Sequence, residues 1–213
     1  MQPINIKYLD LANVYKRNKI KYLKIFNEVM SSGQYVPQKN VKILENKICK
    51  FLKVKYCVTL NSGTDALLMG LYSLNLKKGD EIITTPNTWY ATIAAIIHVG
   101  LVPKFIDIKF DQNFDEDLIV KNISKKTKGI LAVHLNGKMT NVIKIKKICK
   151  KYKLKFVEDA AQAFGASKNG VKAGKYSTAA AFSFNPMKTL GGYGEAGMVV
   201  TDDEDVYEKI KLL

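Results

Sequence analysis

Residues 129–159 read GILAVHLNGKMTNVIKIKKICKKYKLKFVED, and this stretch decides the fold. Two apolar runs in it, Gly129–Leu135 and Lys155–Asp159, have the length and composition of buried strands. Residues 140–152 between them have the 3.6-residue periodicity of an amphipathic helix, with lysines on the polar face. The apolar face of that helix consists of Val142, Ile145, Ile148, Cys149 and Tyr152. The stretch therefore predicts a strand, a crossover helix and a second strand parallel to the first.

The same pattern extends over most of the chain. Five further strand-like runs are Tyr56–Leu60, Glu81–Thr85, Lys104–Ile108, Ala179–Phe184 and Met198–Thr201. The first five of the seven runs begin 25, 23, 25 and 26 residues apart, an interval that holds a strand, a helix and two turns. Residues 64–74 and 89–99, which lie between the first three of these runs, are apolar and are predicted to be helices. We therefore predict an α/β fold with a mostly parallel seven-stranded sheet and helices on both faces.

The segments before the first and after the last of these runs are predicted to be helical. Residues 18–31 and 41–52 are amphipathic and are separated by a turn at Gly33. We therefore expect residues 1–53 to form an N-terminal helical segment that packs on a large domain, residues 54–213. A last helix is expected after Asp202, because acidic residues at its start suit the helix dipole.

The composition is that of a globular protein, with 47% hydrophobic residues among 213. This excludes a disordered chain, a collagen-like repeat and a disulfide scaffold. The formal net charge of +15 would suggest nucleic-acid binding. However, Arg17 is the only arginine, and the lysines are spread along the chain, most densely at 144–155. We prefer a solvated lysine-rich surface, with attraction for anionic partners such as phosphorylated metabolites as the alternative.

The three cysteines, at 49, 57 and 149, offer no CxxC motif and no cluster with histidine. They indicate a structural role in a reducing compartment and no metal site. No run approaches the roughly 18 apolar residues of a membrane span, and the first ten residues lack the pattern of a signal peptide. The expected location is the cytoplasm, without a membrane or nucleic-acid partner.

Polar residues follow several predicted strands at their carboxyl ends, where open α/β sheets bind ligands. The turn Asn61–Asp65, with sequence NSGTD, leads into a helix and could bind a phosphate, or could simply cap that helix. Trp89 could stack on a planar ring or pack in the core. Asp159 could face a crevice, where it needs a cation or a donor, or cap the next segment. Lys188, in a loop rich in Pro and Gly, could be a nucleophile or one of many solvated lysines.

These features lie at the same predicted edge of the sheet. A phosphate-binding turn, an aromatic plate, a carboxylate and a lysine are the groups needed to hold pyridoxal phosphate, whose enzymes use a lysine Schiff base and an acidic partner for the pyridine nitrogen. The sequence also resembles one family in several ordered motifs, beginning near Tyr8. These motifs are SGTDALLMGL, GDEIITTPNTWYATIAAI, GLVPKFIDI, AVHLNGK, VEDAAQAFGA and AFSFNPMKTLGGYGEAGMVVT. The chain resembles the DegT/DnrJ/EryC1/StrS family of fold-type I, pyridoxal-phosphate-dependent aminotransferases that act on nucleotide-linked keto sugars.

The resemblance implies a role for each site residue. Lys188 is expected to form the Schiff base with the cofactor and to move the proton, and Asp159 to keep the pyridine nitrogen protonated. Gln162 is expected beside the cofactor's 3-hydroxyl, and Trp89 on its ring. The expected phosphate ligands are Ser62, Gly63, Thr64 and Ser183. Family members with histidine in place of the lysine are dehydratases, so Lys188 favours transamination.

The resemblance also implies partners. The expected substrates are an amino donor, usually glutamate, and a nucleotide sugar, in a pathway such as surface polysaccharide synthesis. Family members are homodimers with shared active sites, and they are longer than this chain, so we expect the C-terminal small domain to be absent. A second polypeptide could complete the fold. The alternative is a catalytically incomplete fragment that binds the cofactor or a partner. His134, near the predicted crevice, is interpreted as structural, with a catalytic role as the alternative, and His98 is interpreted as structural.

Overall fold

The computed structural model describes residues 7–34, 36 and 39–213. The chain divides into two compact units, Met1–Ile43 and Leu44–Leu213. The predicted N-terminal helical segment, residues 1–53, includes residues 1–6, 35 and 37–38, which lie outside the described part. Packing of that segment on the large domain stays a prediction.

The first unit contains α1 (Leu11–Ser32), which starts earlier than its apolar periodicity predicts. Its start is set by Asp10, whose side chain accepts a hydrogen bond from the Asn13 N–H at 3.1 Å. It ends at Gly33, whose positive φ of 65° closes the helix in the left-handed conformation. All of α1 is described, and none of its residues is buried within the chain.

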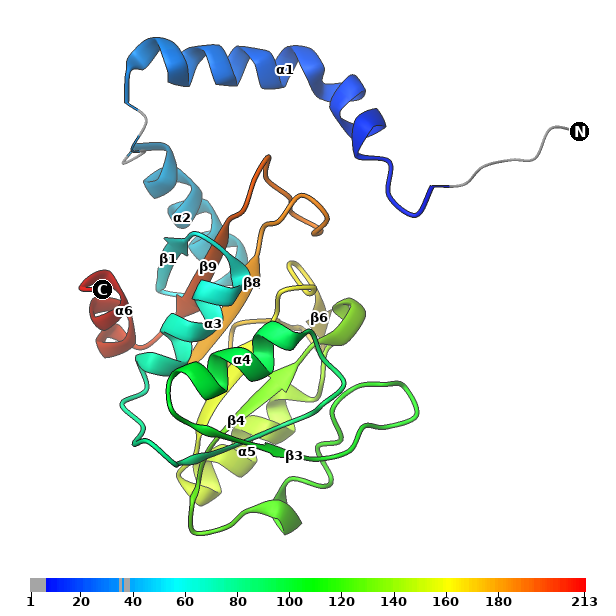
Figure 1. Ribbon diagram of the computed structural model, residues 1–213, viewed down its shortest axis with the longest axis vertical. Helices are drawn as coiled ribbons and strands as arrows, with labels where there is room; N and C mark the ends of the chain where they lie inside the picture. Colours follow the sequence, from blue (N-terminus) through cyan, green and yellow to red (C-terminus); the bar gives the residue numbers. More distant parts are fainter. Residues whose placement is uncertain (1–6, 35, 37–38) are drawn as a thin grey trace, which may run out of the picture. The chain divides into compact units, whose positions relative to one another are not determined.

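The second unit is built on a seven-stranded sheet in the order β1-β9-β8-β5-β4-β2-β3 (Figure 1). Its strands are β1 (Tyr56–Leu60), β2 (Glu81–Thr84), β3 (Val102–Phe105), β4 (Thr127–Val133), β5 (Lys155–Asp159), β8 (Ala179–Ser183) and β9 (Gly197–Thr201). Strand β9 runs antiparallel to both β1 and β8, and every other neighbouring pair in this sheet is parallel. The predicted mostly parallel seven-stranded sheet is confirmed.

The bounds of two strands differ from the prediction by two or three residues. Strand β3 covers Val102–Phe105 instead of 104–108, because its one partner in the sheet is β2, which ends at Thr84 opposite Phe105. Strand β4 begins at Thr127 because its pairing starts opposite Glu81. The hairpin of β6 (Ser167–Lys168) and β7 (Val171–Lys172) was not predicted, since two-residue strands carry no periodicity.

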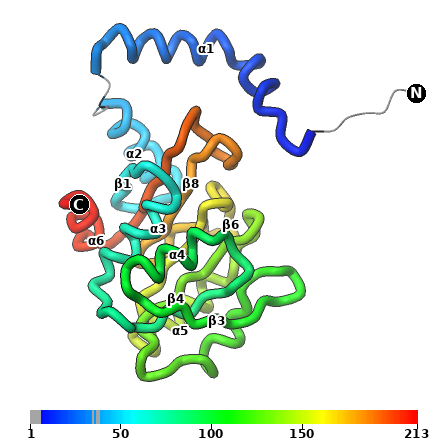
Figure 2. Tube along the Cα trace, viewed as in Figure 1, coloured from blue at the N-terminus to red at the C-terminus, as the bar shows by residue number. Residues whose placement is uncertain are grey.

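Helices cover both faces of the sheet, as predicted (Figures 1 and 2). Their bounds are α2 (Lys39–Leu52), α3 (Gly63–Tyr72), α4 (Tyr90–His98), α5 (Val142–Tyr152) and α6 (Glu204–Lys211). Helices α3, α4 and α6 pack with the sheet residues Leu131, Val133 and Val157. Helix α5 and the last turns of α2 pack with Ile130 and Phe156 on the other face. The alternation along β4 and β5 therefore sends neighbouring side chains into two separate cores.

Helix α5 confirms the analysis of its apolar face. Val142, Ile145, Ile148 and Cys149 are buried, and Asn141 caps the helix by accepting from the Lys144 N–H at 3.1 Å. Over the described residues, no helix combines the length and the apolar character that crossing a bilayer requires.

Candidate active site

The carboxyl ends of β1 and β8 meet the amino end of the antiparallel β9 at one edge of the sheet, which brings distant segments into contact. A Cβ atom built on Gly63 would lie 2.7 Å from the Cβ of Ser183, and one built on Gly197 would lie 2.0 Å from the Ser62 carbonyl oxygen. Only glycine fits at either position. The start of α3 therefore lies directly against the carboxyl end of β8 and the amino end of β9.

The turn after β1 presents the amino end of α3. The Ser62 hydroxyl accepts from the Asp65 N–H at 3.1 Å, so the capping alternative is confirmed for this side chain. The N–H groups of Gly63 and Thr64 begin the helix, where backbone donors lack intrahelical acceptors and the helix dipole is positive. With the buried Ser183 alongside, this turn has the donors of a phosphate-binding site.

Asp159 ends β5 as a buried carboxylate, only 5% exposed. Its Oδ2 accepts from the Thr92 hydroxyl at 2.6 Å, and its Oδ1 accepts from the Ala161 N–H at 3.1 Å. The Thr92 hydroxyl also lies 2.7 Å from that of Thr88. The hydrogen bond from the Ala161 N–H is local, as expected of an aspartate that caps the next segment. The hydrogen bond from Thr92 is long-range and joins β5 to α4.

Burial raises the pKa of Asp159, and the hydrogen bonds from Thr92 and Ala161 and the electrostatic effects of His134 and Lys188 offset this only in part. Ionised Asp159 is therefore destabilised in this site, and a cationic ligand group beside it would stabilise the carboxylate. The Lys188 ammonium is one of the charges that act on it, so the two groups lie within electrostatic range.

Lys188 lies in the loop between β8 and β9. Its N–H donates to the Asn185 carbonyl oxygen at 2.8 Å, and the Gly192 N–H donates to the Phe184 oxygen at 2.8 Å, so the loop folds back on the end of β8. The Lys188 residue is half-buried. The loop thus holds the Lys188 backbone at the edge of the sheet that carries Ser183 and Asp159.

Trp89 and Gln162 occupy the rim of this edge. Trp89 is 66% exposed and contacts the Tyr90 ring at a centroid distance of 5.1 Å, so the alternative that it packs in the core is wrong. The position just before α4 leaves its indole in solvent. The Gln162 side-chain oxygen accepts from the Asn136 N–H at 2.6 Å, which orients its amide.

His134 is structural, as expected, and belongs to a buried pair beneath the edge. Its Nδ1 accepts from the Thr140 N–H at 3.3 Å, so Nε2 carries the proton that is donated to Glu158 Oε2 at 2.7 Å. The same Oε2 accepts from the Gly174 N–H at 3.0 Å. Burial would raise the pKa of Glu158, but these donors hold it below the ordinary value. His98, also expected to be structural, lies exposed in the last turn of α4.

Sequence reasoning missed Thr92 and the pairing of His134 with Glu158. The signal for Thr92 was a threonine within an otherwise apolar stretch of α4, where a fully buried hydroxyl needs a partner. No local signal joins His134 to Glu158, because strands β4 and β5 first have to pair in register.

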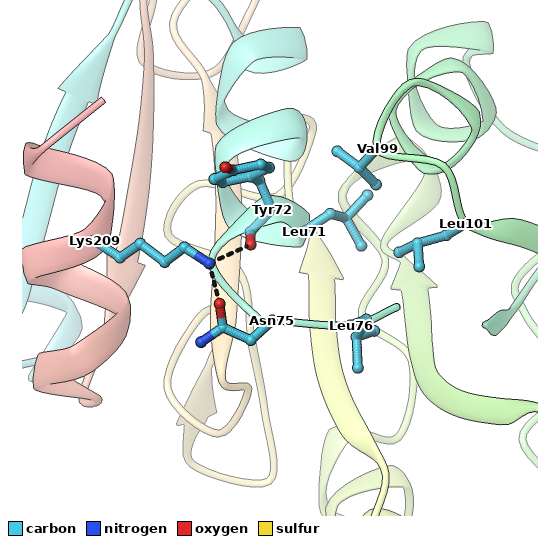
Figure 3. A pocket seen from close by; sticks show the side chains of 7 residues that line it. All are labelled: Leu71, Tyr72, Asn75, Leu76, Val99, Leu101 and Lys209. Carbon is cyan, nitrogen blue, oxygen red and sulfur yellow. Dashed lines mark hydrogen bonds between the residues drawn. The ribbon is translucent and has the colours of Figure 1, made fainter. Parts of the chain in front are cut away.

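A pocket of about 300 Å³ lies elsewhere, between α3, α4 and α6 (Figure 3). Its lining residues end α3, follow α3 or α4, precede β3 or lie in α6, so the pocket lies toward the amino ends of the strands. Lys209 lies in it and donates to the Tyr72 carbonyl oxygen at 3.1 Å and to the Asn75 side chain. It contains none of the predicted site residues.

Comparison with known proteins finds aminotransferases of similar sequence. A uridine-diphosphate sugar enzyme of Pseudomonas aeruginosa, UDP-2-acetamido-2-deoxy-3-oxo-D-glucuronate aminotransferase, is 36% identical over 97% of this chain and 58% of its own length. The 3-oxo-glucose-6-phosphate:glutamate aminotransferase of Bacillus subtilis is 38% identical over 96% of this chain and 46% of its own length. The chain thus spans about half the length of these curated relatives.

Solved structures show the same fold. DesV of S. venezuelae superposes with a TM-score of 0.95 and 32% identity, over 99% of this chain and 57% of DesV. NtdA of Bacillus subtilis, solved with the cofactor PMP bound, gives a TM-score of 0.89 and 33% identity over 99% of this chain and 48% of NtdA. Fold and relatives together define the class of pyridoxal-phosphate-dependent aminotransferases.

Residues 17–213 match the model of the DegT/DnrJ/EryC1/StrS aminotransferase family, and the chain belongs to this family. Its cofactor is pyridoxal phosphate. The residues present fit this group: the first N–H groups of α3 and the buried Ser183 lie together, where a phosphate would find donors, and a cationic ligand group would stabilise the buried Asp159 carboxylate.

Proposed function

We propose that this chain forms the cofactor-binding part of an aminotransferase that moves an amino group from glutamate to a nucleotide-linked keto sugar. The observation that carries the proposal is the convergence at one sheet edge of the α3 turn, the buried Asp159 and the half-buried Lys188. Membership in the family supports the reaction class. The names of the two curated relatives support a nucleotide-sugar acceptor and a glutamate donor, respectively.

In this proposal the cofactor's phosphate binds at the start of α3. The N–H groups of Gly63 and Thr64 and the hydroxyls of Ser62 and Ser183 donate to it. A dianion suits this position because the helix dipole adds to the hydrogen bonds. Trp89 covers one face of the ring, and Gln162 lies by the ring's 3-hydroxyl.

Asp159 keeps the pyridine nitrogen protonated, because its carboxylate is held at both oxygens and its burial favours a cationic partner. Bound pyridoxal phosphate supplies an electron sink that labilises the proton on the substrate's α-carbon. The Lys188 amine would accept that proton at Nζ and return it to the cofactor carbon bonded to the same nitrogen, as general base and then general acid. Lys188 also provides the amine that binds the cofactor in the resting protein.

We propose a homodimer in the cytoplasm, following the family resemblance and the sparse cysteines. The alternative function, a catalytically incomplete fragment, differs in its chemistry: it binds the cofactor or a partner without converting substrate.

The proposal is tested by supplying the chain with pyridoxal phosphate and L-glutamate. We expect the visible absorbance of the lysine-bound cofactor to decay as pyridoxamine phosphate and 2-oxoglutarate form in equal amounts. Cofactor binding without this conversion would favour the fragment alternative. Failure to bind the cofactor would contradict both.

Thr92 is proposed as a positioning residue for Asp159. Thr92→Val keeps the shape of the side chain but removes the donor to Asp159 Oδ2, so the carboxylate loses its alignment. We expect the dissociation constant for pyridoxal phosphate, measured by absorbance titration, to rise about tenfold. Thr92→Ser keeps the hydroxyl and should bind like the parent chain. Equal affinity of the valine and serine variants would refute the role.

Asp159→Asn should raise the thermal stability of the cofactor-free chain and lower its affinity for the cofactor. The pKa of Asp159 is raised in the folded state, so at pH 7 its ionised form lowers the stability of the cofactor-free chain, and asparagine removes that cost. We expect a higher unfolding temperature than the parent at pH 7, with the difference disappearing as the pH falls below about 4, where the unfolded aspartate is also neutral. Cofactor affinity should fall at the same time.

Glu158→Gln is the matched control on the neighbouring residue. The pKa of Glu158 is lowered in the folded state, so its charge stabilises the chain above its unfolded pKa, and that contribution is lost as the pH falls through the folded pKa. The glutamine variant should therefore unfold at a lower temperature than the parent at pH 7, the opposite sign. Thermal unfolding followed by circular dichroism from pH 3 to 8 measures both. A decrease in both variants at pH 7 would contradict the assignment for Asp159.

A further inference from the structure

Two thiols lie close together, in a part of the chain that the proposed function does not use. Cys49 in α2 and Cys57 in β1 have their Sγ atoms 2.9 Å apart. An S–S bond is about 2.05 Å long, so less than about 1 Å of motion separates these sulfur atoms from bonding distance. Both residues belong to the second compact unit, where the end of α2 packs on the sheet.

We propose that Cys49 and Cys57 form a reversible disulfide that joins α2 to β1 when the chain meets a peroxide. Cys49 is half-buried and is the thiol that an oxidant reaches, whereas Cys57 is only 3% exposed. The Cys49 sulfur attacks hydrogen peroxide, which becomes one water, and the cysteine becomes a sulfenic acid. The Cys57 sulfur then displaces the hydroxyl group from the Cys49 sulfur as a second water. Two thiol hydrogens and two electrons have passed to the peroxide.

The third cysteine in the same core provides an internal control. Cys149 in α5 is 6% exposed, and burial raises the pKa of its thiol to about 12. Since the thiolate is the reactive form, this thiol stays inert at neutral pH. Position and exposure therefore assign the reaction to the pair of Cys49 and Cys57.

The bond would act on the chain through α2 and β1. Cys57 is the buried residue of β1, paired with Val200 of β9, and β1 leads directly into the turn at Ser62. A link to α2 closes the short loop between the two elements and restricts the unfolded chain. The oxidised protein should therefore resist unfolding more than the reduced protein.

A test by peptide mapping must distinguish Cys49 from Cys149, because the two cysteines lie in identical tryptic peptides. Trypsin releases Cys49 and Cys149 in the same tripeptide, Ile-Cys-Lys, as residues 48–50 and 148–150. We would therefore oxidise the full-length Cys149→Ser chain with hydrogen peroxide, block remaining thiols and digest it without reductant. The expected product is the tripeptide joined to residues 56–77, with loss of two hydrogens and recovery of both peptides after dithiothreitol. In the otherwise unchanged chain, oxidation should raise the unfolding temperature by about 5 °C, and Cys57→Ser should abolish that rise.

Three results would overturn the proposal. The first is a Cys149→Ser chain in which both thiols remain alkylatable after peroxide has been consumed. The second is a Cys49→Ser chain that links residues 56–77 to the tripeptide as readily as the Cys149→Ser chain, because Cys149 would then be the partner. The third is oxidation that yields mainly disulfides between two chains, measured by non-reducing electrophoresis.

Discussion

Replacing Lys188 by alanine will abolish the covalent bond between the chain and pyridoxal phosphate and reduce the glutamate half-reaction by about 10³-fold or more. The amine is proposed both to bind the cofactor and to move the substrate proton, and no backbone group can replace it in either role. The visible absorbance of the bound cofactor should shift to that of the free aldehyde. Borohydride reduction of the parent should leave the cofactor attached to the peptide that contains Lys188.

The matched control is Lys155→Ala. Lys155 is exposed and begins β5, the strand that ends at Asp159. This variant should keep the parent's absorbance and its half-reaction, because Lys155 lies at the amino end of β5, away from the end that carries Asp159. The Lys188 side chain lies in a loop, so Lys188→Ala should unfold at the parent temperature. Equal spectra for Lys188→Ala and the parent would refute the assignment of the lysine.

Replacing Gly197 by alanine will destabilise the chain by about 3 kcal/mol or more and weaken cofactor binding. The added Cβ would lie 2.0 Å from the Ser62 carbonyl oxygen and 2.7 Å from the Gly63 nitrogen. Both are main-chain atoms, so no side-chain rotation relieves the overlap, and either β9 or the start of α3 has to move. We expect the unfolding temperature to fall by about 10 °C for a chain of this size.

Gly70→Ala provides the control for this substitution. Gly70 lies inside α3, and its added Cβ would meet the nearest side-chain atom at 3.6 Å, an ordinary contact. Alanine also favours the helix over glycine by up to about 1 kcal/mol. This variant should be at least as stable as the parent and should bind the cofactor normally. If Gly197→Ala were as stable as Gly70→Ala, the close approach at the α3 turn would be refuted.

The order of helices and strands could be predicted well because it depends on local periodicity. Four of the five residues predicted on the apolar face of α5 are buried and Tyr152 is half-buried, and the boundaries of β1 and β5 were predicted to the residue. Predictions were less accurate where a partner sets the limit. Strand β3 ends where β2 ends, and α1 begins directly after its Asp10 cap, earlier than the residue 18 that its periodicity predicted.

The candidate site could be predicted as a set of residue types at strand ends, but not in its contacts. Trp89 is an example. Its aromatic side chain is compatible with either stacking on a ligand or packing in the core, and the structure leaves it 66% exposed. The bond between Thr92 and Asp159 joins residues 67 positions apart, and no periodicity connects them.

By itself, the sequence determined the alternation of strands and helices, and therefore that polar residues at strand ends would share one edge. Only the tertiary structure decided that β9 lies between β1 and β8, which presses Gly197 against Ser62 and Gly63 against Ser183. The physical reason is that periodicity reports which face of an element is buried. Strand order instead depends on the summed packing of elements far apart in the chain, and that order decides which side chains meet.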